Sequence, residues 1–234
     1  MALGAGYVQV RRLWRRAPGG AGPDALVFGD DGGSGGEGDL FAVTFAPRLA
    51  VVKLSGERMD MAAVHPGPGA LRLDLPFDLE YFNGAPHAGA VIARLPVRWT
   101  NGGWSLDRTV LLARRWSADE LAFRALAMHE ELRRWAQDRY PALTLYPPEA
   151  KEGTPVTTQA LLELILAGRP DTARALLHRA WPSGWDRLDV KLGGEDAFWA
   201  QLCRAVRRQP LWVRFRLDRL PHAGLIDAAA RRAV

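Results

Sequence analysis

The chain has 234 residues, 48% of them hydrophobic and 24% charged, which is the composition of a globular protein with a packed core. Its single cysteine, Cys203, excludes an intrachain disulfide and a cysteine-rich zinc site, and the absence of any run of about 18 apolar residues excludes a predicted transmembrane helix. The formal net charge of +5 is concentrated at the C-terminal end, because residues 204–234 hold eight arginines and two aspartates.

Residues 1–114 are expected to form an antiparallel β domain, either a sandwich or a curled sheet. The clearest strand lies in residues 71–81, where apolar side chains at odd positions alternate with mainly polar ones. Pro76 within this run predicts an edge position or a bulge. A second alternating run, 91–99, leads into Asn101 and Gly102, which favour a tight hairpin turn. Shorter candidate strands are residues 7–13, 25–28, 40–45, 49–54 and 109–113.

Residues 29–39, GDDGGSGGEGD, connect two of these candidate strands. The run lacks the terminal Lys and the following helix of a phosphate-binding loop, and its acids do not have EF-hand spacing. We therefore interpret it as a mobile hairpin loop. Its carboxylates are the candidate ligands for a divalent cation: Asp30, Asp31, Glu37 and Asp39.

The periodicity becomes helical at Ser117, which is predicted to form a capping box with Glu120. The residues that follow at spacings of three and four form one apolar stripe: Leu121, Ala125, Met128, Leu132 and Trp135. A helix therefore follows the β domain directly.

Further helices are predicted in residues 158–168, 170–181 and 195–209, so residues 115–234 are expected to form a helical domain. Gly168 suits the position after a helix, and Pro170 suits the first turn of the next one. A late strand is also indicated at 211–220, where apolar and polar residues alternate again. The predicted fold class is α+β.

The two helices on either side of Gly168 contain a recognisable pattern. Gly168, Ala173, Leu177 and Ala180 have the spacing by which small residues let two helices approach closely in tetratricopeptide-type repeats, which residues 157–182 resemble. Thr157 and Leu161 stand where that family carries Trp and Gly, and Pro182 comes three residues earlier than the family's proline. The resemblance implies a helical hairpin of the protein-interaction type, and no catalytic residue comes with it.

Carboxylates on the 71–81 strand are the enzymatic candidates. Asp74, Asp78 and Glu80 share one face, with Asp78 and Glu80 about 7 Å apart by strand rise, within the span of acid and base in inverting glycosidases. Acids that alternate on a solvent-facing strand are also ordinary surface patterning. The sequence has no G-x-S-x-G motif, and its five histidines do not pair at helical spacing, so no cofactor or metal is predicted from them.

The arginine-rich end supplies the candidate partner-binding residues, which are Arg204, Arg207, Arg208, Trp212, Arg214 and Arg216. We expect a non-catalytic interaction or scaffold protein that binds a protein partner through its helical C-terminal part. One alternative is a carbohydrate- or ester-processing hydrolase that uses the strand carboxylates. Another is nucleic-acid or anionic-surface binding, in which arginines contact phosphates and Trp212 stacks on a base.

The start of the chain predicts nothing about export, because MALGAGYVQV lacks a basic segment followed by an apolar one. As given, the chain is expected in the cytoplasm. A periplasmic location stays open if Met1 replaces a removed signal peptide. The pattern leaves the oligomeric state open.

Overall fold

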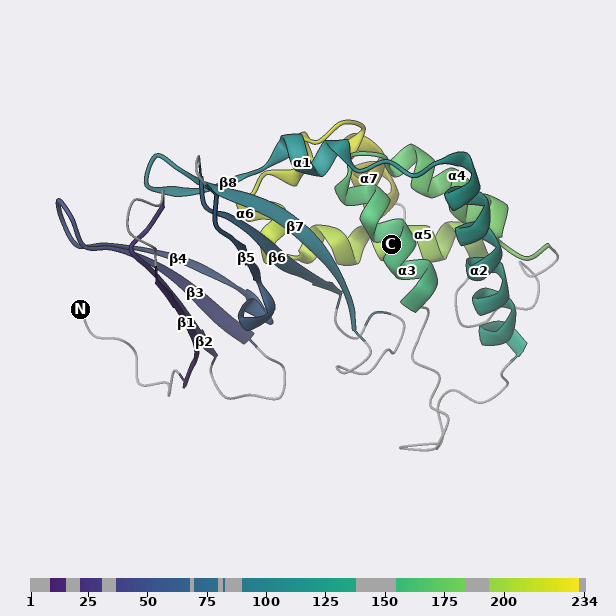
Figure 1. The fold of residues 1–234 in the computed structure, drawn as a ribbon. Helices are drawn as coiled ribbons and strands as arrows, with labels where there is room; N and C mark the ends of the chain where they lie inside the picture. The colour runs from purple at the N-terminus through teal and green to yellow at the C-terminus, as the bar shows by residue number, and fades with distance from the viewer. Residues whose placement is uncertain are drawn as a thin grey trace. The chain divides into compact units, whose positions relative to one another are not determined.

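The computed structural model describes residues 9–15, 22–30, 37–67, 70–79, 82, 90–137, 155–183 and 194–231, and Figure 1 shows the fold. Two antiparallel sheets occupy the N-terminal half and helices follow, which confirms the α+β class. Residue contacts group the chain into two compact units, Met1–Asp78 with Arg94–Val110, and Leu79–Ala93 with Leu111–Val234. A division at residue 114 into independently folding halves stays a prediction.

The first sheet has four antiparallel strands in chain order. Alternation along each strand sends Leu26, Phe28, Leu40 and Leu54 to one face, where all four are buried, so this face is the core side of the sheet. The strands are β1 (Gln9–Arg15), β2 (Ala25–Asp30), β3 (Glu37–Thr44) and β4 (Ala50–Glu57).

The glycine-rich segment joins β2 to β3, which pair as antiparallel neighbours, so the predicted hairpin connection is confirmed. Gly38 suits this pairing because a Cβ there would lie 2.9 Å from the carbonyl oxygen of Gly29. Residues 31–36, and with them the predicted mobility of the loop, lie outside the described residues.

The second sheet has the strand order β5-β6-β7-β8. The predicted alternation on the 71–81 strand is confirmed, because Leu73, Leu75, Phe77 and Leu79 are all buried. Pro76 was expected at an edge, but its strand lies between two others; the short neighbouring strand pairs only as far as Asp74 and ends before the proline. The strands are β5 (Ala63–His65), β6 (Arg72–Leu79), β7 (Val91–Thr100) and β8 (Gly103–Leu106), with the 3₁₀ helix η1 (Met59–Met61) before them.

The hairpin between β7 and β8 is confirmed at the predicted residues. Asn101 and Gly102 both have positive φ, 51° and 76°, as a tight turn matched to the strand twist requires. Trp99 and Trp104 are cross-strand partners, and their rings pack edge-to-face with centroids 5.0 Å apart. This pair and the turn together fix the register of the hairpin.

The first helices begin at capping residues. Residues 109–113, expected as a strand, belong to α1 (Arg108–Ala113), because the Asp107 carboxylate accepts the Val110 N–H at 3.2 Å and starts a helix there. The predicted capping box precedes α2 (Ala118–Gln137): the Glu120 N–H donates to Ser117 Oγ, and the Ser117 N–H donates to Glu120 Oε2 at 2.6 Å. That backbone hydrogen bond is the main reason why the pKa of Glu120 is lowered.

A helical hairpin follows, made of α3 (Pro155–Leu166) and α4 (Pro170–Ala180). Gly168 has φ 70°, its N–H donates to Ile165, and the next N–H, of Arg169, donates to Leu164, which is the Schellman arrangement that ends a helix. The predicted positions of Gly168 and Pro170 are therefore confirmed.

The C-terminal part is helical throughout its described residues. The strand predicted at 211–220 is wrong, because Pro210 starts a short helix and Arg216, at φ 52°, interrupts any extended chain. The elements are α5 (Gly194–Arg208), α6 (Pro210–Arg214), the 3₁₀ helix η5 (Leu217–Arg219) and α7 (Ala223–Arg231). Within the described ranges, no helix has both the length and the apolar character needed to span a membrane.

Candidate interaction surface

The helical hairpin is held at its open end by two side chains of α2. Glu131 accepts the N–H groups of Val156 and Thr157 at 2.8 and 2.7 Å, at the N-terminus of α3. His129 Nδ1 lies 3.1 Å from the carbonyl oxygen of Ala180, at the C-terminus of α4. A carboxylate thus meets the positive end of one helix dipole and an imidazole donor meets the negative end of the other.

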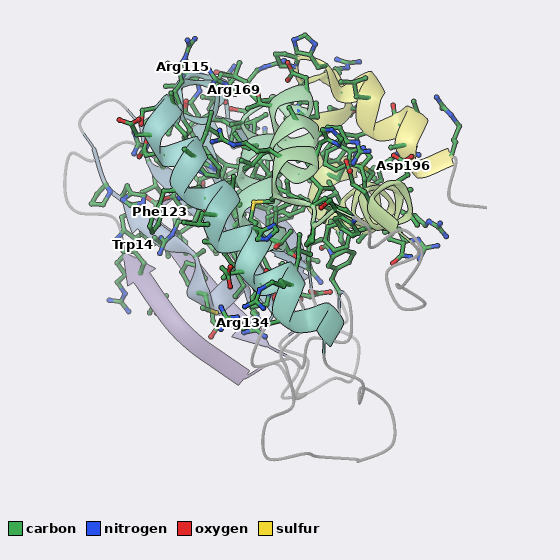
Figure 2. All side chains as sticks on the ribbon, turned by 90° about the vertical axis from the view of Figure 1, so that its right-hand side faces the viewer. Trp14, Arg115, Phe123, Arg134, Arg169 and Asp196 are labelled. Carbon is green, nitrogen blue, oxygen red and sulfur yellow. The ribbon has the colours of Figure 1, made fainter. Side chains whose placement is uncertain are left out.

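These contacts make α2, α3 and α4 one packed group, and α2 contacts both helices of the hairpin. Figure 2 shows α2 in teal, with Phe123 and Arg134 labelled along it. The predicted apolar stripe is confirmed for Ala125, Met128 and Leu132, which are buried, whereas the side chain of Trp135 lies outside the described residues.

A charged cluster joins the hairpin to α5. Arg174 on α4 bonds to Glu195 and, at 2.6 Å, to Asp196, two acids in the first turn of α5. His178 Nδ1 lies 3.0 Å from Glu195 Oε2. Acids at a helix N-terminus are favourable in their own right, so the cluster fixes the start of α5 twice, by dipole and by ion pair.

Cys203 faces the interior of this helical group and is fully buried. Burial raises the pKa of its thiol to about 12, although nearby Arg174 acts in the opposite direction. A thiol with that pKa is protonated at neutral pH and is no nucleophile, so Cys203 serves as a small core residue.

The predicted arginines lie along the end of α5 and on α6, with one exception in their surroundings. Arg207 bonds to Asp227 of α7 at 2.8 Å, and Arg216 lies 3.4 Å from Asp218. Trp212, expected beside them on the surface, is buried because the segment is a helix and its side chain faces the core.

Two of the arginines differ from the others. Arg208 and Arg214 are exposed and make no ion pair within the described part of the chain. Between them lies Val213, whose side chain is 68% exposed. We call Arg207, Arg208, Val213, Arg214 and Arg216 the basic surface. It combines cationic and apolar groups within ten consecutive residues.

The carboxylates of β6 do not form one cluster. Asp78 is buried and bonds to Arg58 at 2.7 Å, so it does not face solvent as the alternation predicts. Asp74 instead lies 3.0 Å from His65 Nε2 on the neighbouring strand. Glu80 lies outside the described residues. Each of the two described acids is thus engaged by a different basic side chain.

The candidate cation ligands are described only in part. Asp39 accepts a hydrogen bond from Ser55 at 2.7 Å and pairs with Lys53 at 2.8 Å. Asp31 and the side chains of Asp30 and Glu37 lie outside the described residues. Among the side chains that are described, no group of three or more His, Cys, Asp or Glu residues is placed to hold a metal ion.

The sequence gave no signal for the roles of Glu131 and His129. A capping residue usually stands next to the helix that it caps, whereas the N–H groups bonded to Glu131 lie 25 and 26 residues further along the chain. Pairings of this kind follow from the packing of α2 on the hairpin. Searches with protein-family models, among curated proteins and among solved structures found no match to this chain.

Proposed function

We propose that the protein is a non-catalytic interaction protein, and that its basic surface binds an acidic segment of a protein partner. The observation that carries the proposal is the pair Arg208 and Arg214, exposed on either side of the exposed Val213 and without ion pairs in the described chain. Guanidinium groups bind carboxylates in bidentate fashion, and an apolar side chain between them adds contact area.

The remaining arginines of the surface add to the positive potential. Arg207 and Arg216 have acidic neighbours, but exposed ion pairs of this kind contribute little and exchange readily with a partner's carboxylates. A cluster of one charge sign also speeds encounter with an oppositely charged partner. The expected ligand is therefore a segment with several acids and at least one apolar residue.

The test uses labelled acidic peptides that contain Leu or Phe, with fluorescence anisotropy at about 50 mM and about 150 mM salt. The double variant Arg208→Glu, Arg214→Glu should weaken binding at least about tenfold, a loss of about 1.4 kcal/mol. The matched control is Arg115→Glu, Arg134→Glu, which changes the net charge equally at two exposed arginines labelled in Figure 2.

An equal loss of affinity in both double variants would show that only net charge matters and would refute the surface. The proposal also fails if the wild type binds no acidic peptide but binds single-stranded oligonucleotides in a salt-sensitive manner. That second result would favour phosphate contacts by the same arginines.

A further inference from the structure

The first sheet has an apolar face on the side opposite its core. The register sets Leu13 opposite Val27 and Val27 opposite Phe41, which makes one row across β1, β2 and β3. A second row sets Val43 opposite Val51 across β3 and β4. We call these five side chains the outer sheet face.

Solvent reaches this face. Leu13 and Val51 are 50% and 51% exposed, and Val27, Phe41 and Val43 are half-buried. An antiparallel sheet with one face in water normally carries polar residues there, in alternation with its core residues. A contiguous apolar patch on an otherwise charged protein is typical of a contact surface.

The polar groups on the same face are satisfied within the chain. Lys53 lies over the Phe41 ring, with Nζ 5.7 Å from its centroid, and bonds to Asp39, which also accepts the Ser55 hydroxyl. The face therefore offers no unbalanced charge to a partner. This chemistry fits a neutral, apolar partner and differs from that of the basic surface.

The face is large enough for an interface of modest size. Strands spaced about 4.8 Å apart and paired over six residues span about 20 Å in each direction, or about 400 Å² in projection. Phe45 and Leu49 adjoin it between β3 and β4 and are both exposed. With side-chain relief, the accessible area approaches the roughly 800 Å² that each partner buries in a standard interface.

We infer that the outer sheet face is a self-association surface, on which a second copy of the chain packs the same face. A two-fold contact brings one patch against itself, so the patch must be complementary to itself in charge and polarity. A neutral apolar sheet face meets that condition, because sheets pack face to face through interdigitated apolar side chains. The product is a dimer with a shared sandwich of two sheets.

The test is sedimentation velocity of the full chain from about 1 to about 200 μM, a range that spans micromolar dimers. The wild type should dimerise with rising concentration. Val51→Lys should raise the dissociation constant at least about 100-fold, because each copy would place one ammonium group against apolar side chains. The matched control is Phe123→Lys on α2, where a side chain 73% exposed and labelled in Figure 2 is changed in the same way without effect on the dimer.

Folding of each variant is checked by circular dichroism, and Leu13→Lys provides a second disruption on another strand of the same face. If Val51→Lys does not fold, the milder Val51→Thr should weaken the dimer by a smaller factor. A wild type that stays monomeric throughout the range overturns the inference. So does a dimer whose dissociation constant is unchanged in Val51→Lys and Leu13→Lys, or one that dissociates in Arg208→Glu, Arg214→Glu instead.

Discussion

The capping contact of Glu131 is the most direct target for mutation. Its carboxylate accepts two backbone N–H groups at the start of α3, 2.8 and 2.7 Å away, and it comes from a different helix. Glu131→Ala removes both acceptors and the negative charge at that end of the helix dipole. The perturbation therefore acts at the contact that joins α2 to the hairpin.

The expected loss of stability follows from these two contributions. Loss of an N-cap costs about 0.5–2 kcal/mol, and the charge at a helix N-terminus contributes about 0.3–1 kcal/mol more. Since Glu131 is partly exposed, we expect Glu131→Ala to lower the free energy of unfolding of the helical unit by about 2 kcal/mol. Glu131→Gln keeps one acceptor oxygen and should lose about half as much.

The assay is urea unfolding followed by helix ellipticity at about 222 nm, where an m-value near 2 kcal/mol/M turns this loss into a midpoint about 1 M lower. Glu130→Ala is the matched control, because Glu130 is the adjacent acid and makes only an exposed ion pair with Arg133, 3.1 Å away. If the midpoints of Glu131→Ala and Glu130→Ala agree within about 0.2 M, the capping interpretation is refuted.

Three further predictions test the packing. Gly168→Ala should cost about 2 kcal/mol, because φ is 70° and a Cβ would lie 2.9 Å from a neighbouring side chain, whereas Gly102→Ala, with φ 76° but open space, should cost about 1 kcal/mol; thermal melts compare them. Asp78→Asn should cost about 3 kcal/mol in denaturant titrations, since it leaves buried Arg58 without its carboxylate, and a loss below 1 kcal/mol would contradict a structural ion pair. The Cys203 thiol keeps its proton in the folded chain up to a pKa of about 12, against 9.0 for an ordinary thiol, so its contribution is full below pH 9 and is lost as the pH rises toward 12; the wild type should lose about 1.4 kcal/mol more than Cys203→Ala between pH 8 and pH 10, and equal losses would contradict a buried thiol.

The elements that the sequence predicts correctly depend on local signals. Asn101 and Gly102 form the turn, Ser117 and Glu120 form the capping box, and Gly168 ends α3, each through hydrogen bonds or dihedral angles set within a few residues. Such features need no knowledge of the rest of the chain. They are therefore readable from single-sequence patterns.

The errors arise where tertiary packing decides. In residues 211–220 an alternating pattern predicted a strand, but Leu211, Trp212 and Phe215 are buried at helical spacing and Val213 is exposed. Asp78 also has the position of a solvent-facing strand residue, and only the approach of Arg58 shows why it is buried. Alternation identifies which residues share a face of a strand, but it cannot show whether a second layer covers the other face.

The two proposed contact surfaces should respond to salt in opposite directions. Between about 0.1 and 1 M salt the Debye length falls from about 10 Å to about 3 Å, which screens the exposed guanidinium groups of Arg208 and Arg214 from a partner's carboxylates. The outer sheet face has no unbalanced charge among its described polar groups, since Lys53 and Asp39 pair with each other. Apolar contacts do not weaken with ionic strength, and sulfate strengthens them. Peptide binding that weakens with salt while the dimer persists would therefore assign the two activities to separate surfaces, and a dimer that dissociates in parallel would place both on the arginines.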